Sequence, residues 1–151
     1  MNQKLSLDEI NAPVGFAAFP IEIGFIGANG PLWLHPHGEV LKLGFRVEMR
    51  HCNPMQICHG GMLATFADLA LGIGGFTLAG VKGFFTTISL NSDYLAPALL
   101  GTWLQCEPVL LRKTRTLVFA QGVCMADGKP VLRASGVFAL PKDPPPQPIG
   151  G

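Results

Sequence analysis

Residues 53–68 read NPMQICHGGMLATFAD and hold an amide, a glycine pair and a carboxylate. Pro54 disfavours helix at Asn53, and Gly60-Gly61 lets the backbone approach a ligand closely where an apolar helix is expected to begin. The first amides of a helix lack internal acceptors and lie at the positive end of its dipole. They therefore suit the oxyanion that develops when a carbonyl is attacked. The same glycines could equally make only a turn.

Asp68 is the only ionisable side chain from Gly60 to Val81. It lies well inside the expected helix, where neither a cap nor the helix dipole explains a carboxylate. Its surroundings in the sequence are apolar and include Leu63, Phe66, Leu69 and Leu71. Desolvation favours the neutral form of an acid and so raises its pKa. A raised pKa suits a general base that works near neutral pH. The alternative is an aspartate satisfied by a structural hydrogen bond or ion pair.

The spacing of the glycine pair and the carboxylate limits how they can act together. Eight residues of helix between Gly60 and Asp68 correspond to ~12 Å of rise. One substrate carbonyl therefore cannot lie within ~3 Å of both groups in a single chain. If both serve one reaction, they must come from two chains whose helices run antiparallel across a two-fold axis. The sequence thus predicts an obligate homodimer with two shared sites.

Hydrophobic patterning predicts the strand before these groups. Apolar and polar residues alternate over 40–50, and a strand at 32–36 would pair with this segment as a hairpin. The apolar face of 40–50 comprises Leu41, Leu43, Phe45, Val47 and Met49.

Patterning also predicts the strands after the helix. Over 84–94 one face is expected to point inward and contains Phe84, Thr86, Ile88, Leu90 and Tyr94. Three more strands are expected at 102–112, 117–125 and 130–140. Asp127-Gly128 is a hairpin signal between the last two.

One long apolar helix and five or six strands must share one core. The sequence therefore predicts an α+β fold in which a curved antiparallel sheet wraps around one central helix. Residues 31–141 are expected to form this domain. Residues 1–30 would precede it with a short helix capped by Ser6 and Glu9, and the Pro/Gly-rich residues 142–151 would form a flexible tail.

Composition excludes several classes of partner and location. The formal net charge is +1 and no basic run is long, so nucleic acid is not expected as a partner. The apolar stretch 62–81 carries a central carboxylate and four glycines, which favours a buried helix over a membrane span. The four cysteines and the absence of an export signal favour reduced thiols in a cytoplasmic protein.

Taken together, NPMQICHGGMLATFAD and the later TTISLNSDYLAPA resemble the PaaI-like branch of the hotdog-fold acyl-CoA thioesterases. The shared pattern is Asn53, then His59-Gly60-Gly61, then Asp68, and Thr86-Thr87 ahead of Pro97. The resemblance implies a hotdog fold, hydrolysis of acyl-CoA without a metal or other cofactor, and homodimers that are commonly paired into a homotetramer.

The resemblance also implies roles for individual residues. The Gly60 amide would polarise the thioester carbonyl, Asp68 of the partner chain would act as base or nucleophile, and Asn53 would orient carbonyl or water. Thr86 would help place the water. The residues expected to contact substrate are His59, Gly61, Thr87 and the basic turn of Arg112, Lys113 and Arg115, which could meet CoA phosphates. In this family the histidine more often shapes the turn than acts in acid–base chemistry.

Three other functions fit parts of the sequence. His51-Cys52 and Cys58-His59 bracket one loop and could bind a metal, although their spacing differs from common zinc knuckles. A non-catalytic acyl-CoA binding module could use the same cleft and helix amides. A hotdog dehydratase is a third alternative, but the sequence lacks the His-containing loop and acid arrangement of such enzymes.

Overall fold

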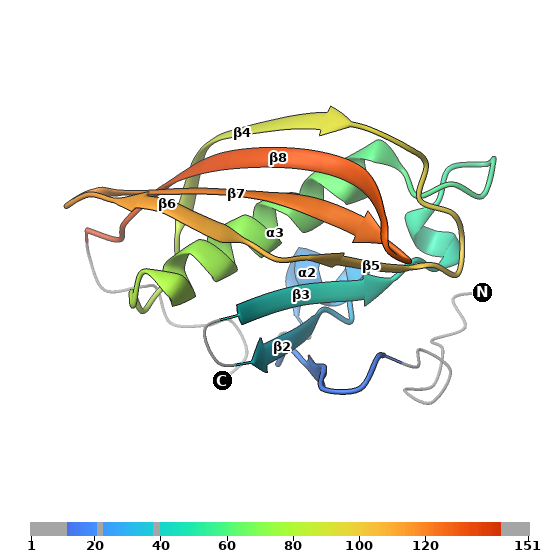
Figure 1. Ribbon diagram of the computed structural model, residues 1–151, viewed down its shortest axis with the longest axis horizontal. Helices are drawn as coiled ribbons and strands as arrows, with labels where there is room; N and C mark the ends of the chain where they lie inside the picture. The colour runs from blue at the N-terminus through green and yellow to red at the C-terminus, as the bar shows by residue number, and fades with distance from the viewer. Residues whose placement is uncertain (1–11, 21–22, 38–39, 143–151) are drawn as a thin grey trace.

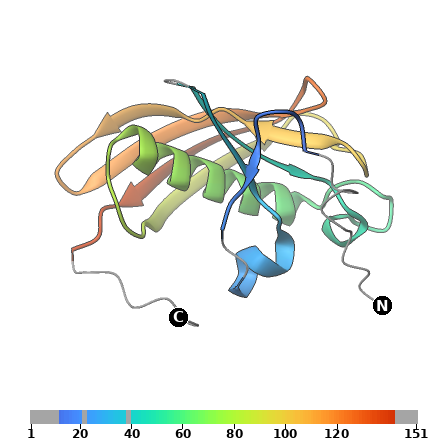
Figure 2. The same ribbon diagram turned by 90° about the horizontal axis from the view of Figure 1, so that it is seen from below.

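The computed structural model describes residues 12–20, 23–37 and 40–142. One curved antiparallel sheet of eight strands partly encloses the helix α3 (Gly60–Leu78), as Figure 1 shows. In Figure 2 the shorter helix α2 (Gly24–Asn29) lies on the same side of the sheet as α3. The predicted fold class is confirmed. The short helix expected near Ser6, the turn at 38–39 and the tail from residue 143 lie outside the described residues.

The sheet has the strand order β1-β2-β3-β5-β7-β8-β4, with β6 paired to β7. In chain order the strands are β1 (Ala17–Ala18), β2 (Trp33–His37), β3 (Val40–Arg46), β4 (Thr86–Tyr94), β5 (Trp103–Cys106), β6 (Val109–Lys113), β7 (Leu117–Ala126) and β8 (Lys129–Ala139). Asp127 and Gly128 have φ of 45° and 82°, which suits the tight turn between β7 and β8. The strand after the helix, β4, forms one edge of the sheet, because its only described partner strand is β8.

The hairpin of β2 and β3 is confirmed, but β3 ends earlier than alternation predicts. Leu41, Leu43 and Phe45 are buried as expected. The chain then enters the 3-10 helix η1 (Met49–His51), closed by a 2.9 Å bond from the His51 N–H to the Glu48 carbonyl. Met49 is 56% exposed and not part of the strand.

The single strand expected at 102–112 is divided into β5 and β6 at Glu107-Pro108. Proline has no N–H to donate to a strand ladder, so the pairing is interrupted there. The Pro108 ring packs against α3, where a Cβ on Gly74 would lie 2.1 Å from it. The break thus lets the sheet bend closely around the helix.

Helix α3 begins at Gly60 as predicted and supplies the centre of the core. Its buried apolar side chains include Leu63, Phe66, Leu71 and Phe76. A Cβ on Gly72 would lie 2.2 Å from the Phe85 ring, so this glycine permits contact that a larger residue would block. Among described helices, only α3 is long and apolar enough to cross a membrane, and half of its apolar window is buried inside the protein.

Candidate functional site

The loop between η1 and α3 is organised by Asn53. Its Oδ1 accepts hydrogen bonds from the N–H groups of Met55 and Ile57 at 3.0 and 3.2 Å. This arrangement accounts for the tight reversal, in which Gln56 has a φ of 61°. Within the described part of the chain, Asn53 Nδ2 has no hydrogen-bond partner. The side chain therefore uses its acceptor to hold the loop and retains its donors.

His59 is the N-cap of α3. Its Nδ1 accepts a 2.8 Å hydrogen bond from the Gly61 N–H, so the ring fixes the first turn of the helix. Gly61 consequently has a protein acceptor for its amide. The Gly60 N–H has none among the described residues. It is the first helical amide, and its geometry leaves it free to donate to a ligand oxygen.

Asp68 faces the edge strand β4 instead of the centre of the core. It is half-buried, and its Oδ1 accepts a 2.7 Å hydrogen bond from the Thr87 hydroxyl. No bond to Oδ2 and no ion pair to Asp68 occur in the described ranges. The sequence predicted a carboxylate desolvated among apolar neighbours, but in the single chain Asp68 is only half-buried, because no further described strand lies beside β4 to cover this face.

The phase predicted for β4 is wrong at its start, although Leu90 and Tyr94 face inward as expected farther along the strand. The pairing of β4 with β8 is irregular between Thr87 and Ser89, where an extra residue is accommodated. Before this irregularity Thr87 points to α3, and successive strand side chains point to opposite faces. Thr86 therefore lies on the face away from Asp68. The hydroxyl that the structure brings to the carboxylate is that of Thr87.

Tyr94 is a site residue that the sequence reasoning missed. Its hydroxyl donates a 2.8 Å hydrogen bond to the Gly60 carbonyl, and its ring lies against the same glycine. The sequence offered a signal for it, since Tyr94 is the only tyrosine of the chain and was expected on the inward face at the end of a strand. It anchors the start of α3 to β4.

The single chain forms two separate groups of site residues. Asn53, His59, Gly60 and Tyr94 gather at the start of α3, whereas Asp68 and Thr87 lie two helical turns farther along. The basic turn of Arg112, Lys113 and Arg115 is exposed at the β6–β7 end of the sheet, opposite the start of α3 in both views (Figures 1 and 2). Within one chain, the residues at the start of α3, the Asp68–Thr87 group and the basic turn therefore lie apart.

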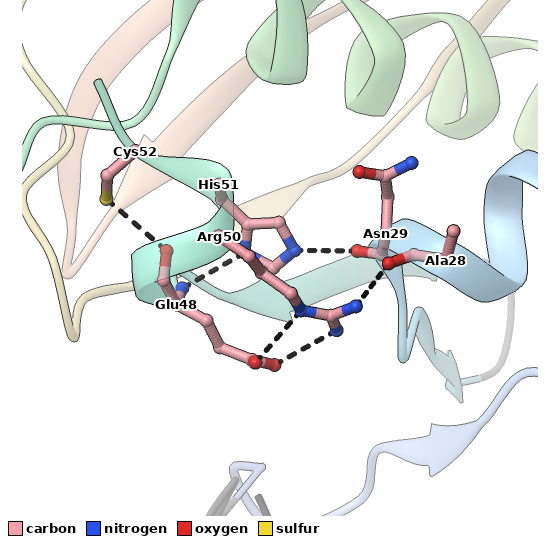
Figure 3. Close-up of polar contacts among 6 residues, drawn as sticks. All are labelled: Ala28, Asn29, Glu48, Arg50, His51 and Cys52. Carbon is pink, nitrogen blue, oxygen red and sulfur yellow. Dashed lines mark hydrogen bonds and ion pairs between the residues drawn. The ribbon is translucent and has the colours of Figure 1, made fainter. Parts of the chain in front are cut away.

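The possible metal ligands around the loop do not converge. Both ring nitrogens of buried His51 are engaged: Nδ1 accepts from the Glu48 N–H at 3.0 Å, and Nε2 donates to the Asn29 carbonyl at 2.7 Å (Figure 3). Burial lowers the pKa of His51, which agrees with a neutral ring in this network. Among the described residues no three His, Cys, Asp or Glu side chains form a potential metal site.

Comparison with known proteins decides the family. Residues 55–130, half of the chain, match the sequence model of the thioesterase superfamily. The chain belongs to this superfamily. The match contains His59, Gly60, Asp68, Thr87 and Tyr94, so of the two groups of site residues only Asn53 lies outside the family region. The protein is a thioester hydrolase of this superfamily, and it has the hotdog fold that PaaI proteins also adopt.

Individual relatives agree with this assignment. The thioesterase is 28% identical over 133 residues to a candidate esterase of Pseudomonas aeruginosa, covering 87% of this chain and 99% of that protein. It is 31% identical over 86 residues to mouse acyl-coenzyme A thioesterase 13, covering 54% and 58% of the two chains. A point mutant of the phenylacetic acid degradation protein PaaI from Thermus thermophilus superposes with a TM-score of 0.66 at 22% identity, covering 78% and 98%.

Proposed function

We propose that this thioesterase hydrolyses acyl-CoA, with an aryl or a short to medium acyl group. The observation that carries the proposal is the Asp68 carboxylate: Thr87 fixes one oxygen, and the other oxygen has no partner in the described chain. A half-buried acid held in this way can deliver an oxygen lone pair to water or to a carbonyl carbon. The similarity to mouse acyl-coenzyme A thioesterase 13 supports CoA as the thiol.

In the proposed reaction the Gly60 N–H donates to the thioester carbonyl oxygen. This amide lies at the helix N-terminus, where the helix dipole places a partial positive charge. That charge stabilises the oxyanion of the tetrahedral intermediate more than the ground-state carbonyl. Asn53 Nδ2 is a second donor that can orient the carbonyl or the water. Water adds an oxygen to the acyl carbon, the carbon–sulfur bond breaks, and the sulfur leaves as the CoA thiol after protonation. Asp68 acts as general base or as nucleophile.

We further propose that each site is shared between two chains. Two helical turns separate Gly60 from Asp68, so the second chain must supply one of them. The edge strand β4 supports this arrangement, because no described strand pairs with its other side and large side chains on it are exposed. Ile88 is 57% and Tyr94 54% exposed, and Leu95, which follows the strand, is 52% exposed. Pairing of β4 with its two-fold copy would extend the sheet and cover the Asp68 face.

A homotetramer is proposed as the larger assembly. Val123 lies between residues that face α3, so it points to the outer face of the sheet, where it is 42% exposed. Val109 of β6 pairs with Gln121 of β7, so the two side chains share this outer face, and Val109 is 48% exposed there. These apolar residues support contact between two dimers. A cytoplasmic location is proposed as well, since all four cysteines are thiols.

A non-catalytic acyl-CoA binding module remains the alternative function, and two comparisons of variants separate it from catalysis. A panel of aryl- and acyl-CoA thioesters is assayed by release of the CoA thiol. Asp68→Asn keeps the shape and the acceptor for Thr87, and is expected to retain CoA binding but lose at least about a hundredfold in kcat. Undiminished turnover in Asp68→Asn would remove this residue from the mechanism.

The second comparison tests the amide at Gly60. Gly60→Pro deletes the N–H, and proline is well tolerated at the first position of a helix. His59, with φ of −60° and ψ of 137°, already has the extended conformation that precedes proline. Gly60→Ala is the matched control and keeps the N–H. Gly60→Pro is expected to lose about a hundredfold in kcat and Gly60→Ala much less. Equal loss in both variants would argue against the amide.

A further inference from the structure

The four cysteines form two directly opposed cross-strand pairs. Cys52 and Cys58 are bridge partners in the loop before α3, and Cys106 and Cys124 are partners between β5 and β7. All four are free thiols. No part of the proposed hydrolysis uses them.

The backbone around Cys52 and Cys58 suits a disulfide. The Asn53 N–H donates to the Ile57 carbonyl at 2.9 Å, and the His59 N–H donates to the His51 carbonyl at 2.8 Å. These two bonds flank the cysteines, so the cysteines form a non-hydrogen-bonded antiparallel pair. The Cα atoms of such a pair lie ~4.5 Å apart. Disulfides accept Cα separations of about 4.4–6.8 Å.

Access distinguishes the two pairs. Cys52 is half-buried and lines an open groove of about 390 Å³ together with Arg50, His59 and Met62. Its thiol donates to the Glu48 carbonyl at 3.3 Å at the surface of η1 (Figure 3). Cys106 and Cys124 are each only 1% exposed. A small reagent can therefore reach Cys52, whereas the second pair is enclosed by the core.

We propose that Cys52 and Cys58 form a reversible disulfide by exchange with a low-molecular-weight disulfide. The Cys52 thiolate attacks one sulfur of the reagent, forming a mixed disulfide and releasing one small thiol. The Cys58 thiolate then attacks Cys52 Sγ and releases the second small thiol. Two protein thiols are oxidised, the reagent is reduced to two thiols, and each departing thiolate takes up a proton lost by a cysteine.

Burial makes this exchange slow at neutral pH. Desolvation raises the pKa of Cys52 and raises that of Cys58 to about 12. Only the thiolate is nucleophilic, so the rate of disulfide formation should increase as the pH rises. The pair is therefore expected to remain reduced unless an oxidising disulfide accumulates.

The disulfide would act on the catalytic loop, a consequence that rests on the proposed function. Cys52 and Cys58 bracket Asn53, and Cys58 precedes the His59 cap of α3. Formation of the disulfide removes the 3.3 Å hydrogen bond from the Cys52 thiol to the Glu48 carbonyl and joins the Cys52 sulfur to that of Cys58, which changes how the loop around Asn53 is held. A displacement of a positioning group by about 1 Å can cost up to a hundredfold in rate, and we expect a loss of about tenfold.

The proposal is tested by incubating the full chain with oxidised glutathione at pH 7.0 and 8.5. The products are analysed by intact mass and by mapping of linked peptides. We expect the mass to fall by two hydrogens, the Cys52 and Cys58 peptides to be linked, the reaction to be faster at the higher pH, and dithiothreitol to reverse it. Cys106 and Cys124 serve as the internal control and should be alkylated only after denaturation.

Two variants identify the order of attack and do not depend on catalysis. Cys58→Ala should trap one glutathione on Cys52, and Cys52→Ser should form no disulfide. Four free thiols in oxidant-treated wild type would overturn the proposal, as would glutathione attached to Cys58 instead of Cys52. A mapped disulfide that leaves hydrolysis unchanged would overturn its effect on the loop. Absence of hydrolysis by the reduced protein would count only against the proposed function.

Discussion

The Thr87 hydroxyl donates a 2.7 Å hydrogen bond to Asp68 Oδ1, and this contact connects an edge strand to the only acid of the central helix. It fixes the orientation of the carboxylate and leaves the second oxygen available. Because β4 has no further described strand beside it, the same contact places the carboxylate where a second chain could complete the site.

Removal of this hydrogen bond should reduce catalysis. In Thr87→Val the side chain keeps its shape but cannot donate, and a hydrogen bond to a charged group is worth about 1.5–3 kcal/mol. We expect kcat/KM to fall roughly tenfold to a hundredfold, and Thr87→Ser to restore most of it. Thr86→Val is the matched control, since Thr86 lies on the opposite face of β4. A larger defect in Thr86→Val than in Thr87→Val would contradict the strand phase described above.

Tyr94→Phe tests the anchor at the start of α3. The variant keeps the ring against Gly60 but removes the hydroxyl that donates to the Gly60 carbonyl. We expect the free energy of unfolding to fall by about 1 kcal/mol and kcat/KM by up to about tenfold. Urea unfolding and steady-state hydrolysis measure the two effects. Loss of stability with unchanged kcat/KM would show that the anchor does not position the amide.

Buried His51 should make stability depend on pH. Its folded-state pKa is lowered from the ordinary 6.5, mainly by burial, and the Glu48 N–H occupies Nδ1. The unfolded chain then binds a proton that the folded chain does not, so this contribution to stability is complete above about pH 6.5 and is lost as the pH falls below it. Urea unfolding at pH 7.5 and 5.5 should show the decrease. In His51→Gln the free energy of unfolding should depend less on pH. An unchanged pH dependence in that variant would show that other groups cause it.

The basic turn should affect KM more than kcat if it meets CoA phosphates. Replacement of Arg112, Lys113 and Arg115 by glutamine is expected to raise KM for acyl-CoA several-fold and to reduce its dependence on salt. The same acyl group on pantetheine lacks the nucleotide phosphates and provides the control substrate. Equal KM changes for the two substrates would exclude phosphate recognition by this turn.

Regular patterns in the sequence were sufficient for most of the fold. The β2–β3 hairpin follows from alternation, and the last strands follow from runs rich in Val, Leu and Phe that turn residues separate. The Asp127-Gly128 turn has its expected geometry. The start of α3 was also predictable, because His59-Gly60-Gly61 precedes a long apolar run. Pro108 divided one expected strand, a break that its missing N–H could have indicated.

The site was less predictable because it depends on pairing between distant segments. The irregularity after Thr87 has no periodic signature, so alternation assigned the inward hydroxyl to Thr86. The partial exposure of Asp68 depends on β4 being an edge strand, which the helix sequence does not encode. Helix α2 is joined to η1 by the bond between His51 and the Asn29 carbonyl, a contact across 22 positions that no local pattern suggests.

Complementation between two inactive variants tests the shared site most directly. Gly60→Pro and Asp68→Asn chains carrying different tags are mixed, allowed to reassemble, and assayed for acyl-CoA hydrolysis. Half of the dimers should be mixed and each should contain one intact site, so we expect about a quarter of wild-type activity in the mixture, all of it in dimers that carry both tags. Doubly tagged dimers with no more activity than the parent variants would contradict a site built from Gly60 of one chain and Asp68 of the other.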